Sequence, residues 1–434
     1  MSAQLISSKE NETRILVTVQ HGQSMLEFEE QLQNELNSAG QLATARQLEH
    51  LDTDGSPIQL GETKFTSKKR KELKIYESQW GPVRVERFVY QSSKGGKIVC
   101  PLDQSARIVV NSTPAFARMV SWKYANMAAP QVEEDLLQNH GRSSSRTTLR
   151  DLADIVGSIA QAKEEVWNYD LPELTDPVAT VSIGLDGTSL LYRDGNYRMA
   201  MCGTISLLND KGERLHTLYC AAAPEYGKAT FMKRLSGEIS KIKKRFPEAT
   251  YVGVADGAPD NWTFLKPFVS VQVLDFYHVS EYVAGAADAL YPGVKSKLDR
   301  QTWLKSTLHK LKHDKGAAKA VCDELQSATV AIKRPALIEK LHKAQTYFKN
   351  NWRKMIYADA RERCLPIGSG VTEAACKVLV KQRMCRSGMR WKETGVSMLL
   401  TLRSLICSTG HWASFWQKMD RFGFPVVHNL QPEH

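Results

Sequence analysis

Five short apolar runs and one amphipathic helix follow one another between residues 178 and 274, and their order limits the possible fold more than any other feature. The runs cover 178–185, 197–208, 214–221, 250–255 and 271–274. Their length and content predict strands, and the short polar links between the first three predict an antiparallel meander. Phe231, Leu235, Ile239, Ile242 and Phe246 recur every three or four residues, which predicts one apolar helix face before the fourth strand.

Three strands, a helix and two further strands follow the order of the ribonuclease H-like fold, an α/β core with a mixed sheet. From 281 to 360 the pattern is helical, as the spacing of Trp303, Leu304, Leu308 and Leu311 illustrates. We expect this segment to be a helical insertion that leaves and rejoins the sheet at one edge. The core is then divided into 171–280 and 361–434, the latter with closing helices and a C-terminal tail.

Two aspartates follow predicted strands and each precedes a glycine: Asp186 in IGLDGTSL and Asp256 in YVGVADGAPDNW. The simpler interpretation of either Asp-Gly pair alone is turn chemistry after a strand. In the expected fold, however, the first and fourth strands are neighbours, so both carboxylates would converge. Two like charges that close favour a bound cation, and carboxylate oxygens suit Mg²⁺ or Mn²⁺. A pair of such ions supports phosphodiester cleavage.

A third carboxylate is expected from Glu373, which follows the Gly368-Ser369-Gly370 loop at the start of a predicted helix. The simpler interpretation is a glutamate favoured by the helix dipole. Glu281 and Glu362 are alternatives that spacing alone does not exclude. The residues after Glu373 are strongly basic and are predicted to hold the DNA backbone near the metal ions: Lys377, Lys381, Arg383, Arg386 and Arg390.

The N-terminal part divides into a mixed α/β region, 1–110, and a helical region, 111–170. Val83 and Val85 alternate with charged residues after Gly81-Pro82, which predicts a β-hairpin. Three predicted helices with the turn HGRSSS between the second and third are typical of a helix-turn-helix, although a small helical linker domain fits the same pattern. Arg146, Thr147 and Arg150 open the third helix and are the expected contacts to DNA bases.

Composition is consistent with a polyanionic partner. The chain has 434 residues and a formal charge of +11, and Lys and Arg gain affinity for nucleic acid by displacing counterions from phosphates. It has no run of 18 apolar residues and no apolar N-terminal signal, so we expect a cytoplasmic protein. The eight cysteines have no zinc-binding spacing.

The motifs LDGT, VADGAPDNW, LDFYH and GSGVTEAACKVLVKQRMCRSGMRW resemble those of ISKra-type bacterial insertion-sequence transposases, which are distantly Mutator-like. The resemblance covers 178–391. It implies that Asp186, Asp256 and Glu373 form a DDE site with two Mg²⁺ or Mn²⁺ ions inside a ribonuclease H-like domain. Asp275 and His278 resemble a D/CxxH motif near that site, and a histidine there would contact the scissile phosphate or orient a base. The simpler interpretation of this pair is a helix cap with a packed histidine.

The resemblance also implies double-stranded DNA partners, namely the element ends and a target, and a homodimer or higher oligomer on DNA in the bacterial nucleoid. Two other functions remain open. A nuclease of the same fold would cut DNA without joining it, and a domesticated regulator would bind DNA without catalysis.

Overall fold

The computed structural model describes residues 3–9, 11–68, 70–96, 98–164, 166–330 and 334–423, which form two compact units. Unit 1 contains the chain up to Tyr169 and the segment from Trp412 onward, and unit 2 runs from Asp170 to His411. The sequence assigned the whole of 361–434 to the core. Instead, helix α16 (His411–Phe422) packs with unit 1, where the ring of Phe415 lies 5.8 Å from that of Trp167.

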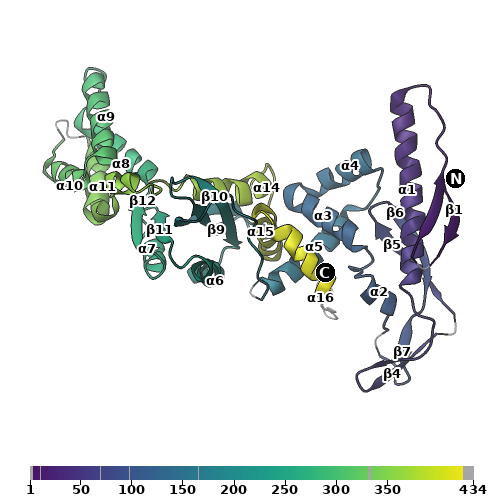
Figure 1. Ribbon diagram of the computed structural model, residues 1–434. Helices are drawn as coiled ribbons and strands as arrows, with labels where there is room; N and C mark the ends of the chain where they lie inside the picture. Colours follow the sequence, from purple (N-terminus) through teal and green to yellow (C-terminus); the bar gives the residue numbers. More distant parts are fainter. Residues whose placement is uncertain are drawn as a thin grey trace. The chain divides into compact units, whose positions relative to one another are not determined.

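Unit 1 begins with small sheets around one long helix (Figure 1). Its elements before the helical region are β1 (Ala3–Ser8), β2 (Thr13–Val17), α1 (Met25–His50), β3 (Ile58–Leu60), β4 (Thr63–Ser67), β5 (Glu72–Ser78), β6 (Gly81–Arg87), β7 (Tyr90–Ser92) and α2 (Pro101–Ser105). Strands β5 and β6 form the predicted hairpin, but its turn is Gln79-Trp80, because Ser78 already pairs with Gly81. Gly81 has φ +142°, and a Cβ there would lie 2.3 Å from Gln41 Nε2.

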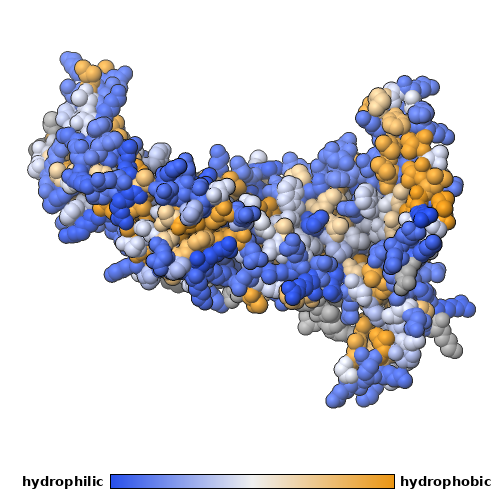
Figure 2. All heavy atoms as spheres, viewed as in Figure 1, coloured by the Kyte–Doolittle hydropathy of each residue, from blue (hydrophilic) through white to orange (hydrophobic). Residues whose placement is uncertain are grey.

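Exposed apolar side chains gather over α1 and the neighbouring β1–β2 hairpin, as the orange area there in Figure 2 shows. They include Ile6, Leu16, Met25, Leu26 and Leu36. Exposed apolar side chains are common on protein surfaces, so these residues by themselves indicate no function for this part of unit 1. Among the described residues, every helix is too short or too polar to cross a lipid bilayer.

The three predicted helices of unit 1 are present as α3 (Pro114–Asn126), α4 (Ala129–His140) and α5 (Arg146–Lys163). Gly141 ends α4 in the left-handed conformation at φ 59°, and the Ser145 side chain caps α5 by accepting a hydrogen bond from the Thr148 amide. Arg142 in the turn is buried and pairs with Glu77 of β5 at 2.7 Å. The turn is therefore fixed to the hairpin.

Unit 2 contains a mixed five-stranded sheet of order β10-β9-β8-β11-β12 (Figure 1). Its strands are β8 (Thr180–Leu191), β9 (Tyr197–Leu208), β10 (Arg214–Ala222), β11 (Thr250–Ala255) and β12 (Val271–Leu274). The first three form the predicted antiparallel meander, and β11 lies parallel to both β8 and β12. The first and fourth strands of the unit are neighbours, as the sequence predicted.

Helices cover both faces of the sheet. On one face lie η1 (Tyr226–Lys228), α6 (Ala229–Arg245) and α7 (Pro259–Leu265); a Cβ on Gly203 of β9 would lie 2.9 Å from Leu235 of α6. The other face carries α13 (Gly370–Ala375), a π-helical turn (Cys376–Lys381), α14 (Gln382–Met384) and α15 (Glu393–Cys407). A Cβ on Gly184 of β8 would collide with Thr372 of α13, so this helix lies directly on the sheet.

The described residues between β12 and α13 are mostly helical, as predicted for this segment. The helices are α8 (Phe276–Leu290), α9 (Lys297–His313), α10 (Ala317–Ser327), α11 (Pro335–Asn351), η2 (Trp352–Lys354) and α12 (Tyr357–Glu362). Their buried side chains, such as Leu325 and Phe348, belong to the same hydrophobic cluster as Val254 and Val273 of the sheet. The insertion and the sheet therefore share one core.

Candidate active site

Three aspartates lie within two residues of the last paired positions of the parallel strands β8, β11 and β12, and we call them the acidic row. Strand pairing matches Gly184 with Val254 and Ala255 with Leu274. Continuing the same register places Asp186 beside Asp256 and Asp256 beside Asp275, and the Asp275 amide donates to the Ala255 carbonyl at 2.9 Å as this register requires. Neighbouring strands are about 4.8 Å apart, so the three acidic residues lie near one another where the parallel pairing of the strands ends.

Asp186 differs from the prediction in one respect. The sequence placed it after its strand, whereas β8 continues to Leu191 and Asp186 pairs with Cys202 of β9. One carboxylate oxygen of Asp186 accepts from the Gly187 amide at 2.7 Å, and the other lies 3.8 Å from Cys376 Sγ. The strand continues because β9 supplies a full set of backbone partners as far as Tyr197.

Glu373 reaches the sheet because two small features allow its helix to approach. Gly184 has no side chain, and a Cβ there would stand 2.1 Å from Thr372 Oγ1. Thr372 Oγ1 lies 2.7 Å from Thr204 Oγ1 of β9, and both groups are buried. Glu373 is the next residue, in the first turn of α13. The predicted helical start is confirmed.

Asp275 fixes the loop that leads to Glu373. Its Oδ1 accepts hydrogen bonds from the amides of Tyr277 and His278. Asp275 therefore caps α8, in agreement with the simpler interpretation of this residue as a helix cap. Its Oδ2 accepts from the Ser369 amide at 2.8 Å and from the Ser369 hydroxyl. Four contacts use the acceptor capacity of one carboxylate. Asp275 is fully buried and acts as a positioning residue for α13.

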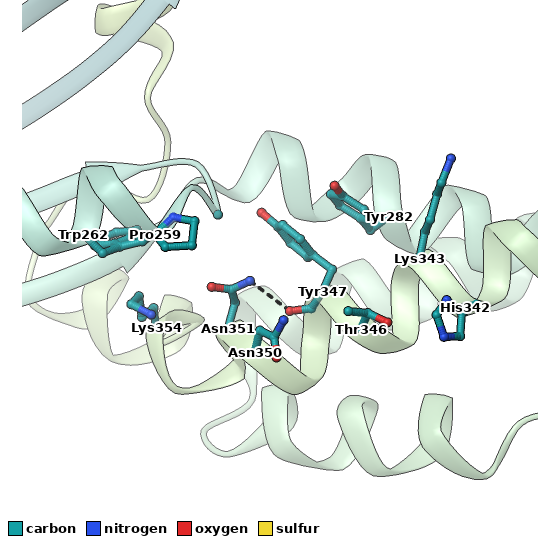
Figure 3. Close-up of a pocket in the computed structure, with 11 residues that line it drawn as sticks. Pro259, Trp262, Tyr282, His342, Lys343, Thr346, Tyr347, Asn350, Asn351 and Lys354 are labelled. Carbon is teal, nitrogen blue, oxygen red and sulfur yellow. Dashed lines mark hydrogen bonds between the residues drawn. The ribbon is translucent and has the colours of Figure 1, made fainter. Parts of the chain in front are cut away.

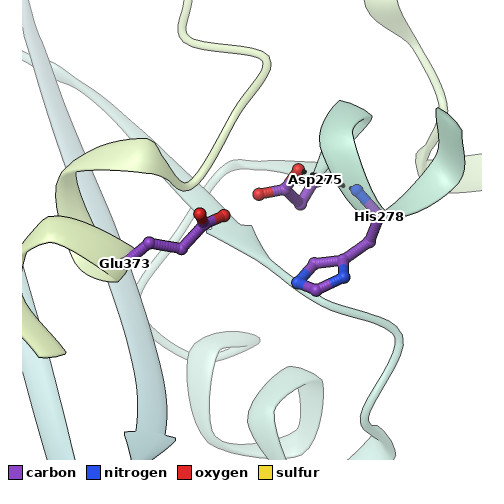
Figure 4. A group of neighbouring side chains, drawn as sticks. All are labelled: Asp275, His278 and Glu373. Atoms are coloured by element: carbon purple, nitrogen blue, oxygen red, sulfur yellow. Dashed lines mark hydrogen bonds between the residues drawn. The ribbon is translucent and has the colours of Figure 1, made fainter. Parts of the chain in front are cut away.

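His278 is not packed in the core, contrary to the simpler interpretation. Its side chain is 38% exposed, and Nδ1 lies 3.5 Å from a carboxylate oxygen of Glu281. Asp275, His278 and Glu373 can each offer one ligand atom so that the three atoms lie within 4.8 Å of one another (Figure 4). In Figure 4, Glu373 approaches from α13, and the other two residues come from the start of α8. Neither Asp186 nor Asp256 belongs to this group of three.

A cavity of about 700 Å³ opens beside these groups. Asp186, His278 and Glu373 line it together with the exposed Lys377 and Lys381. Carboxylates beside lysines suit a hard cation and a phosphate bound together. Asp256 is described by the structure but does not belong to the lining of this cavity.

Asp256 is held at the beginning of α7. Its Oδ1 accepts from the Ala258 amide at 3.1 Å and from Asn261 Nδ2 at 3.0 Å. The next residue, Gly257, touches the insertion: a Cβ there would lie 2.6 Å from Tyr347 of α11. Burial raises the pKa of Tyr347, and the charges of Tyr282 and Asp256 raise it further. Tyr347 is therefore a neutral hydroxyl at physiological pH.

The basic residues after Glu373 differ in their exposure to solvent. Lys377, Lys381, Arg386 and Arg390 are exposed. Arg383 is only 3% exposed, and its guanidinium lies 5.5 Å from the ring centre of Trp391. The expectation that Arg383 holds DNA is therefore wrong, because it points into the protein.

Arg146, Thr147 and Arg150 of unit 1 lie exposed at the start of α5. Arg146 Nε is bonded to Glu133 of α4, and Arg150 pairs with Asp151 at 2.9 Å. Both ion pairs are on the surface, where such pairs contribute little to stability. The three residues lie in the first two turns of α5, where the sequence placed them.

Sequence reasoning missed the roles of Gly184 and Thr204, because neither lies in an acidic or basic motif. The closeness of Gly184 to Asp186 was the only local signal. Searches against protein-family models and curated proteins found no match to this chain.

Proposed function

We propose that this protein is a metal-dependent DNA transposase with a ribonuclease H-like core. The observation that carries the proposal is the acidic row of Asp186, Asp256 and Asp275, with Glu373 brought over the same sheet by α13. The strand order β10-β9-β8-β11-β12, interrupted by helices after β12, supports this choice of fold. The motif resemblance to ISKra-type transposases supports the choice of reaction.

Asp186, Asp256 and Glu373 would hold two Mg²⁺ or Mn²⁺ ions, because their oxygens are the ligands that such hard cations prefer. When bound, the two ions activate the attacking oxygen and stabilise the leaving one. Asp275 holds the Ser369 loop and thereby keeps Glu373 over the sheet. Lys377 and Lys381 bind backbone phosphates at the cavity, and His278 orients the scissile phosphate there.

Recognition of the element ends is assigned to α5 through Arg146, Thr147 and Arg150, with α3 and α4 as the supporting helices of a helix-turn-helix. Two ends must be joined in one event, so the active form is a homodimer or higher oligomer on DNA. A basic DNA-binding protein of this kind belongs in the bacterial cytoplasm, associated with the nucleoid.

The test is an assay of nicking and joining on DNA that carries the inverted repeats flanking the gene. We expect Mg²⁺ or Mn²⁺ to support both steps and EDTA to abolish them, while end binding persists. Joining is measured on a pre-cleaved end. Cleavage without joining would identify a nuclease, and end binding without cleavage in any metal would identify a regulator. Cleavage that survives EDTA would contradict the metal mechanism.

A further inference from the structure

A second cavity, of about 720 Å³, lies between α7, α8 and α11 (Figure 3). Its size is in the range of sites that hold a small organic molecule. Trp262 of α7, Tyr282 of α8 and Tyr347 of α11 supply aromatic surface, and Lys354 and Asn351 supply polar groups. In Figure 3 these side chains surround one space, approached from three separate elements.

The aromatic rings are held in fixed positions. Tyr282 and Tyr347 stack with centroids 3.8 Å apart and planes 11° from parallel. Gly257 makes room for Tyr347, since a Cβ there would meet its ring. Asn351 Nδ2 donates to the Tyr347 carbonyl at 3.0 Å, so the amide side chain is also fixed. A rigid aromatic wall loses little entropy when a flat ring binds beside it.

Two polar atoms of this wall have no hydrogen-bond partner. The hydroxyl of Tyr347 and the indole nitrogen of Trp262 are both buried and unpaired. A buried group without a partner reduces stability, and native proteins rarely retain one without a reason. A bound molecule with acceptor atoms at the edge of a flat ring would pair with such donors.

The cavity also holds a positive charge. Lys354 Nζ lies 5.2 Å from the ring centre of Trp262, and the residue is partly buried. Lys343 at the other end is already paired with Glu339 at 2.7 Å. Lys354 is therefore placed to bind an anion that lies beside the aromatic surface.

The cavity adjoins the acidic row. Gly257 and Pro259 line it, and Gly257 directly follows Asp256 in the chain. A DNA strand bound at Asp256 would have its next nucleotide near the cavity, because Gly257 belongs to the cavity wall. Stacking on aromatic rings beside lysine is the usual way of holding an unpaired base.

From this geometry we infer that the cavity between α7, α8 and α11 binds one unpaired nucleotide of the DNA strand next to the cleavage site. The inference rests on the proposed function for its choice of DNA. The base stacks on the tyrosine pair and accepts hydrogen bonds from Tyr347 and Trp262, while Lys354 binds the adjoining phosphate. Cutting would thus require a locally unpaired strand.

The test uses the full chain in EDTA with a 12-nucleotide single strand that contains 2-aminopurine. We expect quenching of its fluorescence on binding, and weaker binding of the same strand once annealed to its complement. Tyr282→Ala should weaken single-strand binding by roughly 5- to 150-fold, the range for loss of one stacked base. The matched control is Tyr197→Ala, an exposed tyrosine of β9 outside the cavity, which should bind as the wild type does.

Tyr347→Phe separates binding from folding. Removal of an unpaired buried hydroxyl should raise the Tm of the free protein and weaken single-strand binding, two changes of opposite sign. Lys354→Gln should lower the slope of log Kd against log salt by about 0.7, and the control Lys349→Gln should leave it unchanged. If all three cavity variants bind like the wild type, or if duplex binds as tightly as single strand, the inference is wrong.

Two further measurements distinguish a failure of this inference from a failure of the proposed function. Asp186→Asn should keep the quenching, because the assay needs no metal ion. If the wild-type protein quenches the fluorescence but does not cleave DNA with Mg²⁺ or Mn²⁺, that result counts against the proposed function alone. Displacement of the oligonucleotide by free dAMP at equal affinity would assign the cavity to a soluble nucleotide and overturn the inference.

Discussion

Thr372 Oγ1 lies 2.7 Å from Thr204 Oγ1. This hydrogen bond joins α13, the helix that carries Glu373, to β9, the strand that pairs with β8 beside Asp186. The two residues are 168 positions apart in the chain, with the whole insertion between them, yet their contact sets the height of α13 above the sheet. Gly184 completes the contact from β8, because any side chain there would occupy the position of Thr372.

Gly184→Ala should therefore lift α13 and misplace Glu373. We expect a loss of about 1 to 3 kcal/mol in the free energy of unfolding, typical of overpacking, and a loss of DNA cleavage larger than the loss of stability explains. Urea denaturation and a nicking assay measure the two effects. Gly285→Ala is the control: a Cβ there has open space in the middle of α8, and it should stabilise the helix by about 0.5 to 1 kcal/mol.

Glu373→Gln should abolish cleavage and leave the Tm and end binding unchanged, because the amide keeps the shape and loses the charge. Glu281→Gln and Glu362→Gln should retain substantial activity. Glu281 lies beside His278, and Glu362 is an exposed residue paired with Lys315 at 2.6 Å. Loss of cleavage in Glu362→Gln with normal activity in Glu373→Gln would reverse the assignment.

Asp275→Asn should differ from Glu373→Gln in its effect on folding. An amide cannot accept all four contacts that Asp275 makes, so we expect a lower Tm together with reduced cleavage. Thermal melts of both variants provide the comparison. An unchanged Tm in Asp275→Asn with full loss of cleavage would make Asp275 a metal ligand instead of a positioning residue.

The arginines after Glu373 should separate into two classes. Arg383→Ala removes a buried guanidinium that lies over Trp391, so it should lower the free energy of unfolding by about 1 to 3 kcal/mol. Arg386→Ala and Arg390→Ala should fold normally, and each should reduce the salt slope of duplex binding by about 1. A normal slope in both variants would place these two arginines away from the DNA.

Arg146→Ala and Arg150→Ala should weaken binding to the element ends more than binding to unrelated DNA. Each good base contact contributes about 1 to 3 kcal/mol to discrimination, and both arginines are exposed at the start of α5. Competition binding with both DNAs measures the difference. An equal loss on the two DNAs would assign these arginines to phosphate contacts only.

Stability should depend on pH through His411. Burial, with smaller contributions from the charges of His216 and Lys241, lowers the pKa of His411 to about 4. An unfolded imidazole binds a proton below about pH 6.5, so this contribution is complete above pH 6.5 and is lost as the pH falls towards 4. The loss amounts to about 3 kcal/mol. His411→Gln should flatten this dependence in urea titrations at several pH values, whereas the exposed His50→Gln should follow the wild type.

The sequence by itself determined the order and type of the elements in unit 2. Alternating and continuous apolar runs defined β8 to β12 within one or two residues at most ends, and the regular spacing from Phe231 to Ile242 defined the inner face of α6. It also singled out Asp186, Asp256 and Glu373. These features are local, because each depends on residues close together in the chain.

Only the tertiary structure decided which of these residues meet. The row of three aspartates depends on strand register, the approach of Glu373 depends on the missing side chain of Gly184, and the burial of Arg383 depends on Trp391. Register and close packing arise between segments far apart in sequence, and no local pattern records them. For the same reason the sequence did not indicate that Asp275 supports the loop before Glu373, or that Tyr347 of the insertion lies against Gly257.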